Sequence, residues 1–322
     1  MKKWIAAAAL AITAMTGTAH AEGHGEYPDR PIMLMVSYGA GGATDFQARI
    51  VTMTSGNEDA LGMPMAIVNR PGAGGRVGWN WFATDVEPDG YTMAVYNIPH
   101  FIAQSIEGGV SYTIDDFEPI ANWGADPAVF VVGADSAFNS MDDVIAYAKA
   151  NPGGLTFSGA GLFVGHHIAA LQLEKAAGVE LAYIPNNAGG AGAMRAVIAG
   201  EVLGGVNNLS DAFRAEAAGN VKILGVFDLE RNAFLPDVPT MMEQGYDIDN
   251  ASVNFRGLMV PKGTPQPIID HLAAVVPTMF ENGSVQSRME AGGSPMHIMT
   301  RDEVLEMWAA RQATLEELLA GL

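Results

Sequence analysis

Residues 32–45 read Ile-Met-Leu-Met-Val-Ser-Tyr-Gly-Ala-Gly-Gly-Ala-Thr-Asp, and a segment of helical pattern follows from Phe46. An apolar run of strand length that ends in a glycine-rich turn predicts a buried strand leading sharply into a helix. The first N–H groups of such a helix lack partners within it and, with the helix dipole, favour a carboxylate or phosphate. The plainer interpretation is a tight turn in which Thr44 or Asp45 caps the helix.

The amino terminus has the parts of a secretory signal peptide. Lys2 and Lys3 precede an apolar run at residues 4–15, and Ala19-His-Ala21 matches the small-residue cleavage pattern. The apolar run is too short to span a bilayer. We therefore expect residues 1–21 to be removed and the mature protein to begin near Glu22, outside the cytoplasm.

Charge and composition exclude several classes of protein. The chain has 17 Lys and Arg against 36 Asp and Glu, a formal charge of −19, which becomes −21 when the two lysines of the leader are removed. This acidity argues against nucleic acid or an anionic membrane surface as a partner. Because cysteine is absent, neither disulfides nor thiolate chemistry is available. We expect no metal and no cofactor, and an anion site must therefore use backbone donors, without arginine.

Two further units repeat the order of strand, turn and helix. Residues 65–68 form a predicted strand that enters Asn69-Arg-Pro-Gly-Ala-Gly-Gly75, and residues 91–96 form a third strand. Strands that alternate with helices at this spacing indicate a parallel sheet with helices on its faces. Neither glycine turn is a dinucleotide fingerprint, because Thr44 and Val77 stand where G-x-G-x-x-G needs its last glycine.

Three motifs follow one another in this half of the chain: Tyr38-Gly-Ala-Gly-Gly-Ala-Thr-Asp45 with Arg49, Asn69-Arg-Pro-Gly-Ala-Gly-Gly75, and Pro88-Asp-Gly-Tyr-Thr92. Their order and spacing resemble the substrate-binding proteins of tripartite tricarboxylate transporters, also called the Bug or TctC-like family. Matches at 147–152, 158–161 with His166, 237–240, 243–246 and 261–265 extend the resemblance over essentially all of the mature chain.

The resemblance implies an α/β fold of the two-lobed periplasmic binding protein type II, each lobe a mostly parallel sheet flanked by helices. Residues 22–125 and 256–322 form the expected first lobe, and residues 126–255 form the second. Two crossings between them form a hinge, an architecture that closes around a ligand. In the second lobe we expect strands at 126–132, 155–157, 179–184, 202–208 and 221–227, with helices at 140–150, 166–177 and from Gly192.

The resemblance also implies a function and a site. The protein is expected to capture a small organic carboxylate in the interlobe cleft and deliver it to the membrane subunits of a tripartite tricarboxylate transporter, as a monomer and not as an enzyme. The first lobe contributes amides and the Thr44 hydroxyl, the second lobe contributes the turn at 186–190, and Tyr38 and the loop at 158–162 form the wall. The implied binding residues are Tyr38, Gly41, Gly42, Ala43, Thr44, Asp45, Asn97, Ser158, Gly161, Leu162, Phe163, His166, Asn186, Asn187, Ala188, Gly189, Gly190 and Asn207.

Several of these residues have a plainer structural interpretation. Asp45 either orients a ligand or only caps the first helix, and the two asparagines at 186 and 187 either donate to a ligand or cap the next helix. Leu162 and Phe163 are bulkier than the small residues expected in that loop of the family. They predict an apolar wall that disfavours citrate-like ligands and leaves room for a monocarboxylate or an aromatic acid.

Two other classes of function stay open at this point. A periplasmic hydrolase or metal enzyme is disfavoured because the sequence has no G-x-S-x-G, no H-E-x-x-H and no other triad or ligand motif. A ligand-sensing partner of a signalling receptor is not separable from transport on sequence. Glu22-Gly-His24 would form an amino-terminal copper or nickel site if cleavage follows Ala21, although a histidine at that position arises readily by accident.

Overall fold

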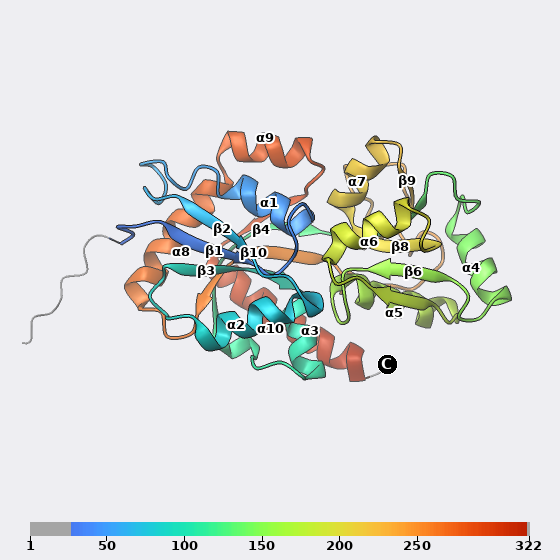
Figure 1. Cartoon of the computed structure of the whole chain (residues 1–322), viewed down its shortest axis with the longest axis horizontal. Helices are drawn as coiled ribbons and strands as arrows, with labels where there is room; N and C mark the ends of the chain where they lie inside the picture. The colour runs from blue at the N-terminus through green and yellow to red at the C-terminus, as the bar shows by residue number, and fades with distance from the viewer. Residues whose placement is uncertain (1–26, 321–322) are drawn as a thin grey trace, which may run out of the picture.

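The structure is a computed structural model that describes residues 27–320. The predicted signal peptide and the Glu22-Gly-His24 segment lie outside these residues. The described chain forms two lobes that lie side by side, each built on one β-sheet (Figure 1). The two-lobed α/β architecture expected from the sequence is therefore confirmed.

The first lobe is built on a six-stranded sheet with the order β11-β4-β10-β3-β1-β2. Its strands are β1 (Ile32–Val36), β2 (Met65–Asn69), β3 (Thr92–Ile98), β4 (Phe117–Asp126), β10 (Asn254–Pro261) and β11 (Met296–Met299). Its helical segments are α1 (Ala43–Val51), η1 (Ala73–Gly75), α2 (Arg76–Asp85), α3 (His100–Glu107), η2 (Ile114–Asp116), α8 (Gln266–Phe280), α9 (Gly283–Ala291) and α10 (Arg301–Ala320).

The second lobe is built on a five-stranded sheet with the order β7-β6-β8-β5-β9. Its strands are β5 (Ala128–Gly133), β6 (Thr156–Gly159), β7 (Ala182–Pro185), β8 (Gly204–Asn208) and β9 (Val221–Phe227), and its helices are α4 (Met141–Ala150), α5 (Gly165–Ala177), α6 (Gly189–Ile198) and α7 (Leu209–Ala217). Ser140 caps α4, because its hydroxyl accepts a hydrogen bond from Asp143 N at 3.2 Å.

Both sheets are mixed, which corrects the expectation that each is mostly parallel. In the first sheet β1 is parallel to β2 and β3, whereas β10 is antiparallel to β3 and β4. In the second sheet β6 is parallel to β7 and β8, whereas β5 is antiparallel to β8 and β9. The parallel pairs come from the local strand–helix units. The strands that lead the chain from one lobe to the other pair with their neighbours in the antiparallel direction.

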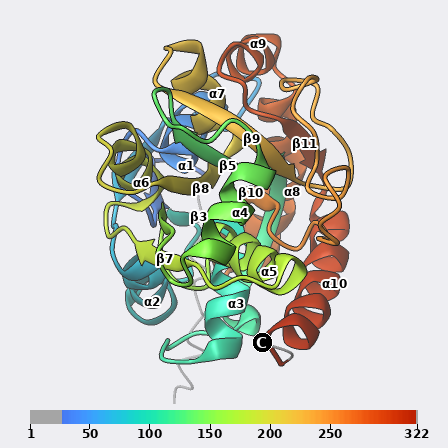
Figure 2. The same ribbon diagram turned by 90° about the vertical axis from the view of Figure 1, so that its right-hand side faces the viewer.

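Strand β5 shows why helices cover both faces of the second sheet. Successive side chains of a strand point to opposite faces. Ala128, Phe130 and Val132 pack with α4 and α5, and Val129 and Val131 pack with α6 and α7. Figure 2 shows these helices around the second sheet, seen from the end of this lobe. The alternation places the starts of α6 and α7 on the side of the sheet away from α4 and α5.

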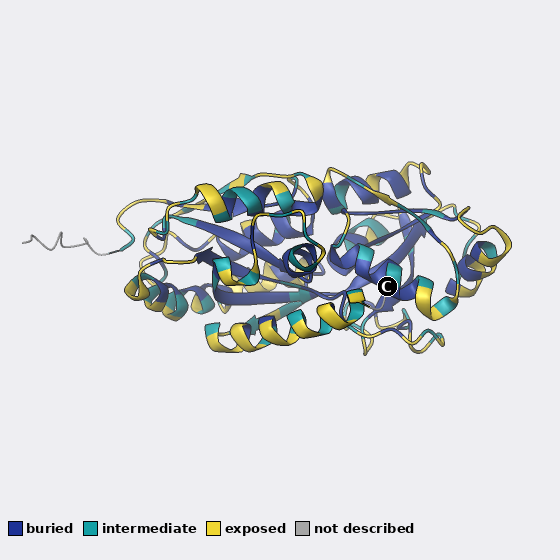
Figure 3. Ribbon diagram, turned by 90° about the horizontal axis from the view of Figure 1, so that it is seen from below, coloured by how far each residue is buried: buried dark blue, intermediate teal, exposed yellow. Residues whose placement is uncertain are grey.

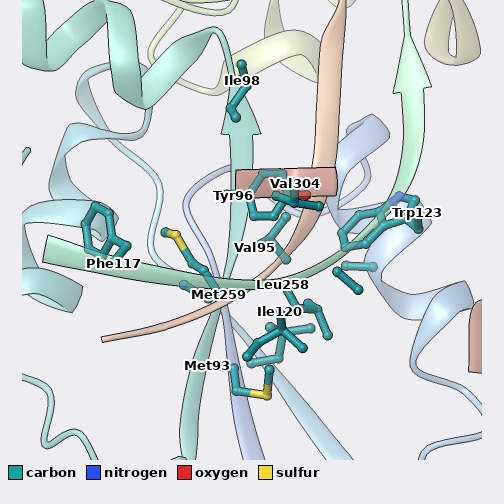
Figure 4. Close-up of a cluster of buried hydrophobic side chains, with 14 of the residues drawn as sticks. Met93, Val95, Tyr96, Ile98, Phe117, Ile120, Trp123, Leu258, Met259 and Val304 are labelled. Carbon is teal, nitrogen blue, oxygen red and sulfur yellow. The ribbon is translucent and has the colours of Figure 1, made fainter. Parts of the chain in front are cut away.

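The core of the first lobe lies where β3, β4 and β10 meet α10. Figure 4 shows the packed side chains of Met93, Val95, Tyr96, Ile98, Phe117, Ile120, Trp123, Leu258, Met259 and Val304. The rings of Tyr96 and Trp308 lie 5.2 Å apart, edge to face. The strands are buried and α10 exposes its outer face (Figure 3), so the carboxyl-terminal helix covers the strands that lead to the hinge.

The chain passes between the lobes twice, once from β4 to β5 and once from β9 to β10. A salt bridge between Arg256 Nη1 and Asp126 Oδ2, at 2.7 Å, joins the two strands at this hinge, and both side chains are 0% exposed. Asp126 also accepts hydrogen bonds from Ser210 N in the second lobe and Gln47 Nε2 in the first, each at 3.1 Å. One buried carboxylate therefore contacts both lobes and both crossings.

Candidate functional site

The turn between β1 and α1 presents backbone N–H groups. Gly42 is the N-cap residue of α1 and makes no side-chain cap hydrogen bond, so the first amides of the helix are left for other acceptors. Gly41 has a φ of 86°, a left-handed conformation that favours glycine. The glycines at this turn therefore let another group approach the start of α1 closely.

Asp45 stabilises this turn through hydrogen bonds. Its carboxylate accepts hydrogen bonds from Gly41 N at 2.9 Å, Arg49 Nη2 at 2.8 Å and Asn69 Nδ2 at 2.9 Å. Burial opposes ionisation, but the hydrogen bonds from Arg49, Gly41 and Asn69 lower the pKa of Asp45 below its usual value. Asp45 lies outside the lining of the cavity described below, and the protein's own donors occupy its oxygens, so in this structure it acts on the turn.

The facing turn precedes α6 in the second lobe. Asn186 Oδ1 accepts a hydrogen bond from Ala188 N at 3.0 Å, and Asn207 Nδ2 donates to Gly190 O at 3.0 Å. These two side chains shape the turn. Ala188 is the N-cap residue and makes no side-chain cap hydrogen bond, so the first amides of α6 are also without partners inside the helix.

A cavity of about 20 Å³ lies where the two turns meet. A Cβ on Gly39 would lie 3.3 Å from Ala188 O, and one on Gly42 would lie 3.6 Å from Ala191 N. The cavity is lined by Tyr38, Gly39, Gly42, Ala43, Thr44, His100, Ala160, His166, Ala188, Gly190, Ala191, Asn208, Asp211 and Asn254. Its volume suits about one water, so a larger ligand enters only if the lobes move apart.

Thr44 presents its hydroxyl hydrogen at this cavity. Its Oγ1 accepts hydrogen bonds from Asn97 Nδ2 at 3.0 Å and from Arg256 Nε at 3.2 Å. A hydroxyl has one hydrogen and two lone pairs, so both acceptor positions of Thr44 are used and its hydrogen is left to donate. Arg256, which the sequence analysis did not identify, does not line the cavity but donates to Thr44, which does.

The hydrogen bonds around His166 also leave it as a donor at the cavity. Its Nδ1 accepts a hydrogen bond from Ala160 N at 3.0 Å, which places the proton of the neutral ring on Nε2. Nε2 has no hydrogen-bond partner among the described residues, and the nearby Asn208 side chain acts to raise the pKa of the ring. Burial lowers the pKa of His166 to about 4, so the imidazole is neutral near pH 7 and donates through Nε2.

His100 is the second imidazole at the cavity. It is 2% exposed, and its Nδ1 has no partner within residues 27–320. Burial, with the neighbouring His166 and Arg256, lowers the pKa of His100 well below its usual value. Both histidines are therefore neutral hydrogen-bonding groups near pH 7.

A chain of amides joins the lobes along the floor of the cavity. Asn97 Nδ2 donates to Asn254 Oδ1 at 3.1 Å, and Asn254 Nδ2 donates to Asn208 Oδ1 at 3.3 Å. Because Asn97 also donates to Thr44, the chain runs from the first helix through the hinge strand to the start of α7.

The carboxylate of Asp211 also lies at the cavity. It lies in the first turn of α7 and accepts a hydrogen bond from Ala43 N of α1 at 3.1 Å. Its other oxygen accepts from Arg214 Nη2, and a Cβ on Gly190 would lie 3.4 Å from Asp211 Oδ2. Burial raises the pKa of Asp211, and the charge of Arg214 opposes that rise. The starts of α1 and α6 therefore both face an acidic side chain of the protein.

A second set of contacts closes the lobes beside the cavity. The carbonyl of Leu162 accepts hydrogen bonds from Arg76 Nη1 and Gln104 Nε2, each at 3.2 Å. The Leu162 side chain is 43% exposed and lies outside the cavity lining, as does Phe163. The carbonyl of Leu162 makes an interlobe contact and the Phe163 side chain packs against the core of the first lobe, so neither residue lines the cavity as the expected apolar wall.

The structure brings part of the predicted set together. Tyr38, Gly42, Ala43, Thr44, His166, Ala188 and Gly190 line the cavity, whereas Gly41, Asp45, Asn97, Ser158, Gly161, Leu162, Phe163, Asn186, Asn187, Gly189 and Asn207 lie outside its lining. Among the latter, Asn97 and Asn207 act one hydrogen bond behind it. Ser158 bonds to the neighbouring strand through Ile184 O at 3.0 Å.

Sequence reasoning missed Gly39, His100, Ala160, Ala191, Asn208, Asp211 and Asn254. The pair at 207–208 carried a usable signal, because polar residues that follow a buried strand lie at the sheet edge where such cavities form. His100 and Asn254 carried no comparable signal. They are polar residues at the ends of strands from different parts of the chain, and only packing brings them together.

A larger groove of about 940 Å³ lies at the far end of the first lobe. It is lined by Tyr27, Asp29, Arg30, Pro88, Asp89, Tyr91, Pro265, Pro267, Ile268 and His271. Its lining, within the described part of the chain, comes from the first lobe alone and includes the start of α8, so helix starts from the two lobes do not meet there. We therefore place the candidate site at the smaller cavity, where donors converge.

Two further features of the described residues bear on other classes of protein. Within residues 27–320, no three side chains of the metal-binding types are grouped so as to hold an ion. In the same part of the chain, every helix is too short or too polar to cross a lipid bilayer.

The fold and the site define a two-lobed solute-binding protein. A family model described as TctC, tripartite tricarboxylate transporter family receptor, matches residues 48–314. The chain belongs to this family, which confirms the resemblance seen in the sequence motifs.

Individual proteins agree with this assignment. Protein BugT of Bordetella pertussis is 31% identical over 280 residues, which cover 86% of this chain and 84% of BugT. The structure of periplasmic binding protein BugD aligns with a TM-score of 0.84 at 27% identity and covers 92% of this chain and 98% of BugD. MatC from Rhodopseudomonas palustris, with bound malate, aligns with a TM-score of 0.82 at 24% identity, covers 91% of this chain and 99% of MatC, and shows a likeness of fold.

Proposed function

We propose that this protein is a periplasmic solute-binding protein that captures a small organic carboxylate between its lobes and delivers it to the membrane subunits of a tripartite tricarboxylate transporter. One observation carries the proposal. The starts of α1 and α6, one from each lobe, open onto a single cavity together with the donors of Thr44 and His166. Each of these groups stabilises negative charge. Membership of the transporter receptor family supports it.

In this proposal the donors act without carrying net charge. The Thr44 hydroxyl and His166 Nε2 donate to the carboxylate, and the first amides of α1 and α6 complete its coordination. Tyr38 and His100 form the walls. Such donors suit a protein with a formal charge of −19, because fixed dipoles hold an anion without the desolvation of a further cation.

Binding is proposed to couple to closure of the lobes. Residues 22–125 with 256–322 and residues 126–255 act as two bodies that separate to admit the ligand and close upon it. The signal peptide is removed near Ala21, and the protein acts as a monomer, which leaves both lobes free to move. Intact-mass measurement of the exported protein and its molar mass in solution test these two points.

Titration calorimetry of the mature protein tests the proposed function. The panel contains mono-, di- and tricarboxylates, each beside its uncharged amide. We expect at least one carboxylate to bind and its amide to show no measurable binding. Absence of binding by every carboxylate of the panel would contradict the proposed function.

Thr44→Val tests the role of the hydroxyl, because valine keeps the shape and removes the donor. A hydrogen bond to a charged group contributes about 1.5–3 kcal/mol, so we expect the Kd to rise roughly ten- to hundredfold. The matched control is Thr52→Val at the C-cap of α1, where the hydroxyl donates to Ala48 O at 2.7 Å. An unchanged Kd for Thr44→Val, with the same ligand, contradicts the assigned role.

A further inference from the structure

The bond between Ala43 and Asp211 crosses the cavity. Ala43 N belongs to the start of α1, Asp211 Oδ2 belongs to α7, and 168 residues separate them in the sequence. Both residues line the cavity, and Asp211 is 8% exposed. A ligand larger than one water molecule must break the hydrogen bond between Ala43 and Asp211 to enter, because the cavity has a volume of about 20 Å³.

The ion pair with Arg214 favours the ionised form of the Asp211 carboxylate, whereas burial raises its pKa. Oδ2 accepts from Ala43 N and Oδ1 accepts from Arg214 Nη2, so both oxygens act as acceptors. The charges that act on it are Arg214 on the same helix, Asp126 on β4 and Arg256 on β10. The two histidines at the cavity are neutral near pH 7. The ion pair with Arg214 leaves Oδ2 as an acceptor that faces the ligand space.

When a ligand breaks the hydrogen bond between Ala43 N and Asp211 Oδ2, one group needs a new acceptor and the other needs a new donor. Ala43 N, together with Thr44 and His166, needs an acceptor, and a carboxylate supplies it. Asp211 Oδ2 loses its donor and needs a new one, because a buried acceptor without a partner is costly. A ligand that brings only its negative charge would also place like charges against each other at close range.

We propose that Asp211 selects carboxylates that carry a hydroxyl or ammonium group on the carbon next to the carboxylate. Such a ligand inserts into the bond between Ala43 and Asp211. Its carboxylate accepts from Ala43 N, and its hydroxyl or ammonium donates to Asp211 Oδ2. This inference rests on the proposed function and names the class of carboxylate that the cavity takes.

Calorimetry with matched pairs of ligands tests the inference on the wild-type protein. The pairs are lactate against propionate, alanine against propionate, and malate against succinate, which differ only in the group on that carbon. We expect the hydroxyl- or ammonium-bearing member of at least one pair to bind at least tenfold more tightly. The lactate and alanine arms separate a hydroxyl from an ammonium preference.

The variant Asp211→Asn tests the residue. An amide offers both a donor and an acceptor, so we expect the preference within the pair to fall to about twofold or less. Asp135→Asn, an exposed residue of the second lobe with the same change in charge, is expected to keep the wild-type preference.

Three results are distinguishable. Equal binding of both members of every pair by the wild type overturns this inference and leaves the proposed function standing. A preference that survives Asp211→Asn overturns the assignment to Asp211. Absence of binding by any carboxylate overturns the proposed function and the inference together. The wild-type comparison decides the first point even if the variant does not fold.

Discussion

At the scale of single residues, the site shows how neighbours fix the direction of a hydrogen bond. Thr44 and a neutral histidine can each donate or accept. Asn97 and Arg256 use the lone pairs of Thr44, and Ala160 N uses Nδ1 of His166. Both groups are left as donors before any ligand arrives, which is the arrangement that an anion requires.

A neighbouring residue, His167, links stability to pH. Its Nδ1 accepts a hydrogen bond from Phe163 N at 3.2 Å, and its ring lies 4.7 Å from that of Tyr183. Burial, with a contribution from Arg76, lowers the pKa of His167 to about 4. Between the unfolded value of about 6.5 and this value, the unfolded chain binds a proton that the folded chain does not. Stability from this group is therefore present above pH 6.5 and is lost as the pH falls toward 4.

We expect His167→Phe to reduce the acid sensitivity of folding. The fall in unfolding free energy from pH 7 to pH 5, measured in urea, is expected to be smaller in the variant by up to about 2 kcal/mol. Because both proteins contain the same carboxylates, their titration cancels in the difference. His297→Phe, at the exposed position of β11, is the control and is expected to behave as the wild type. Parallel pH profiles for His167→Phe and the wild type would falsify this prediction.

At the scale of elements, turns from the two lobes pack directly on each other. The turn between β6 and α5 contacts η1 of the first lobe, and a Cβ on Gly161 would lie 2.6 Å from Gly74 Cα. The carbonyl of Leu162 in the same turn accepts from Gln104 and Arg76. Backbone atoms therefore meet across the cleft, and there is no room for a side chain at Gly161.

We expect Gly161→Ala to hinder closure of the lobes while each lobe still folds. The added methyl group would meet backbone, which cannot move aside as a flexible side chain does. The radius of gyration from small-angle X-ray scattering should exceed that of the wild type, and the Kd for the carboxylate identified by calorimetry should rise at least tenfold.

Gly108→Ala is the matched control for this change. Gly108 also has a positive φ, 94°, and no atom lies within 4 Å of the position of its Cβ. Its substitution carries the backbone cost without a contact between lobes. If both variants change the radius of gyration equally, the interlobe clash is not the cause.

At the scale of the whole molecule, the hinge is organised around one buried carboxylate. Asp126 joins Arg256 of the returning strand, Gln47 of the first lobe and Ser210 of the second. Arg256 continues the network to Thr44. The residues that join the two lobes at the hinge and the Thr44 hydroxyl proposed to bind the ligand thus belong to one hydrogen-bond network.

We expect Asp126→Asn to destabilise the protein by about 3–5 kcal/mol, because it leaves the buried charge of Arg256 without a partner. Urea unfolding at pH 7 measures the loss. The double variant Asp126→Asn with Arg256→Met removes both charges and is expected to recover a large part of it. A double variant as unstable as the sum of the two single variants would show that the pair is not coupled.

Much of the architecture was predictable because it follows from local pattern. Apolar runs that end in glycine-rich turns gave β1 with α1 and marked the turn before α6, and the motifs around them identified the family. The direction of the interlobe strands was not predictable in this way. Apolar β4, β5 and β10 have no local signal for parallel or antiparallel pairing, which depends on how the chain crosses between lobes.

The sequence by itself determined that a glycine-rich turn leads into each of the two helices at the candidate site, because glycine content and the order of strand and helix are properties of neighbouring residues; α6 begins at Gly189, three residues before the expected Gly192. Only the tertiary structure decided which side chains complete it. Asp211 meets Ala43 across 168 residues, and Arg256 meets Thr44 across 212. Such partners are brought together by tertiary packing, between the lobes for Asp211 with Ala43 and within the first lobe for Arg256 with Thr44, and no pattern along the chain records these contacts.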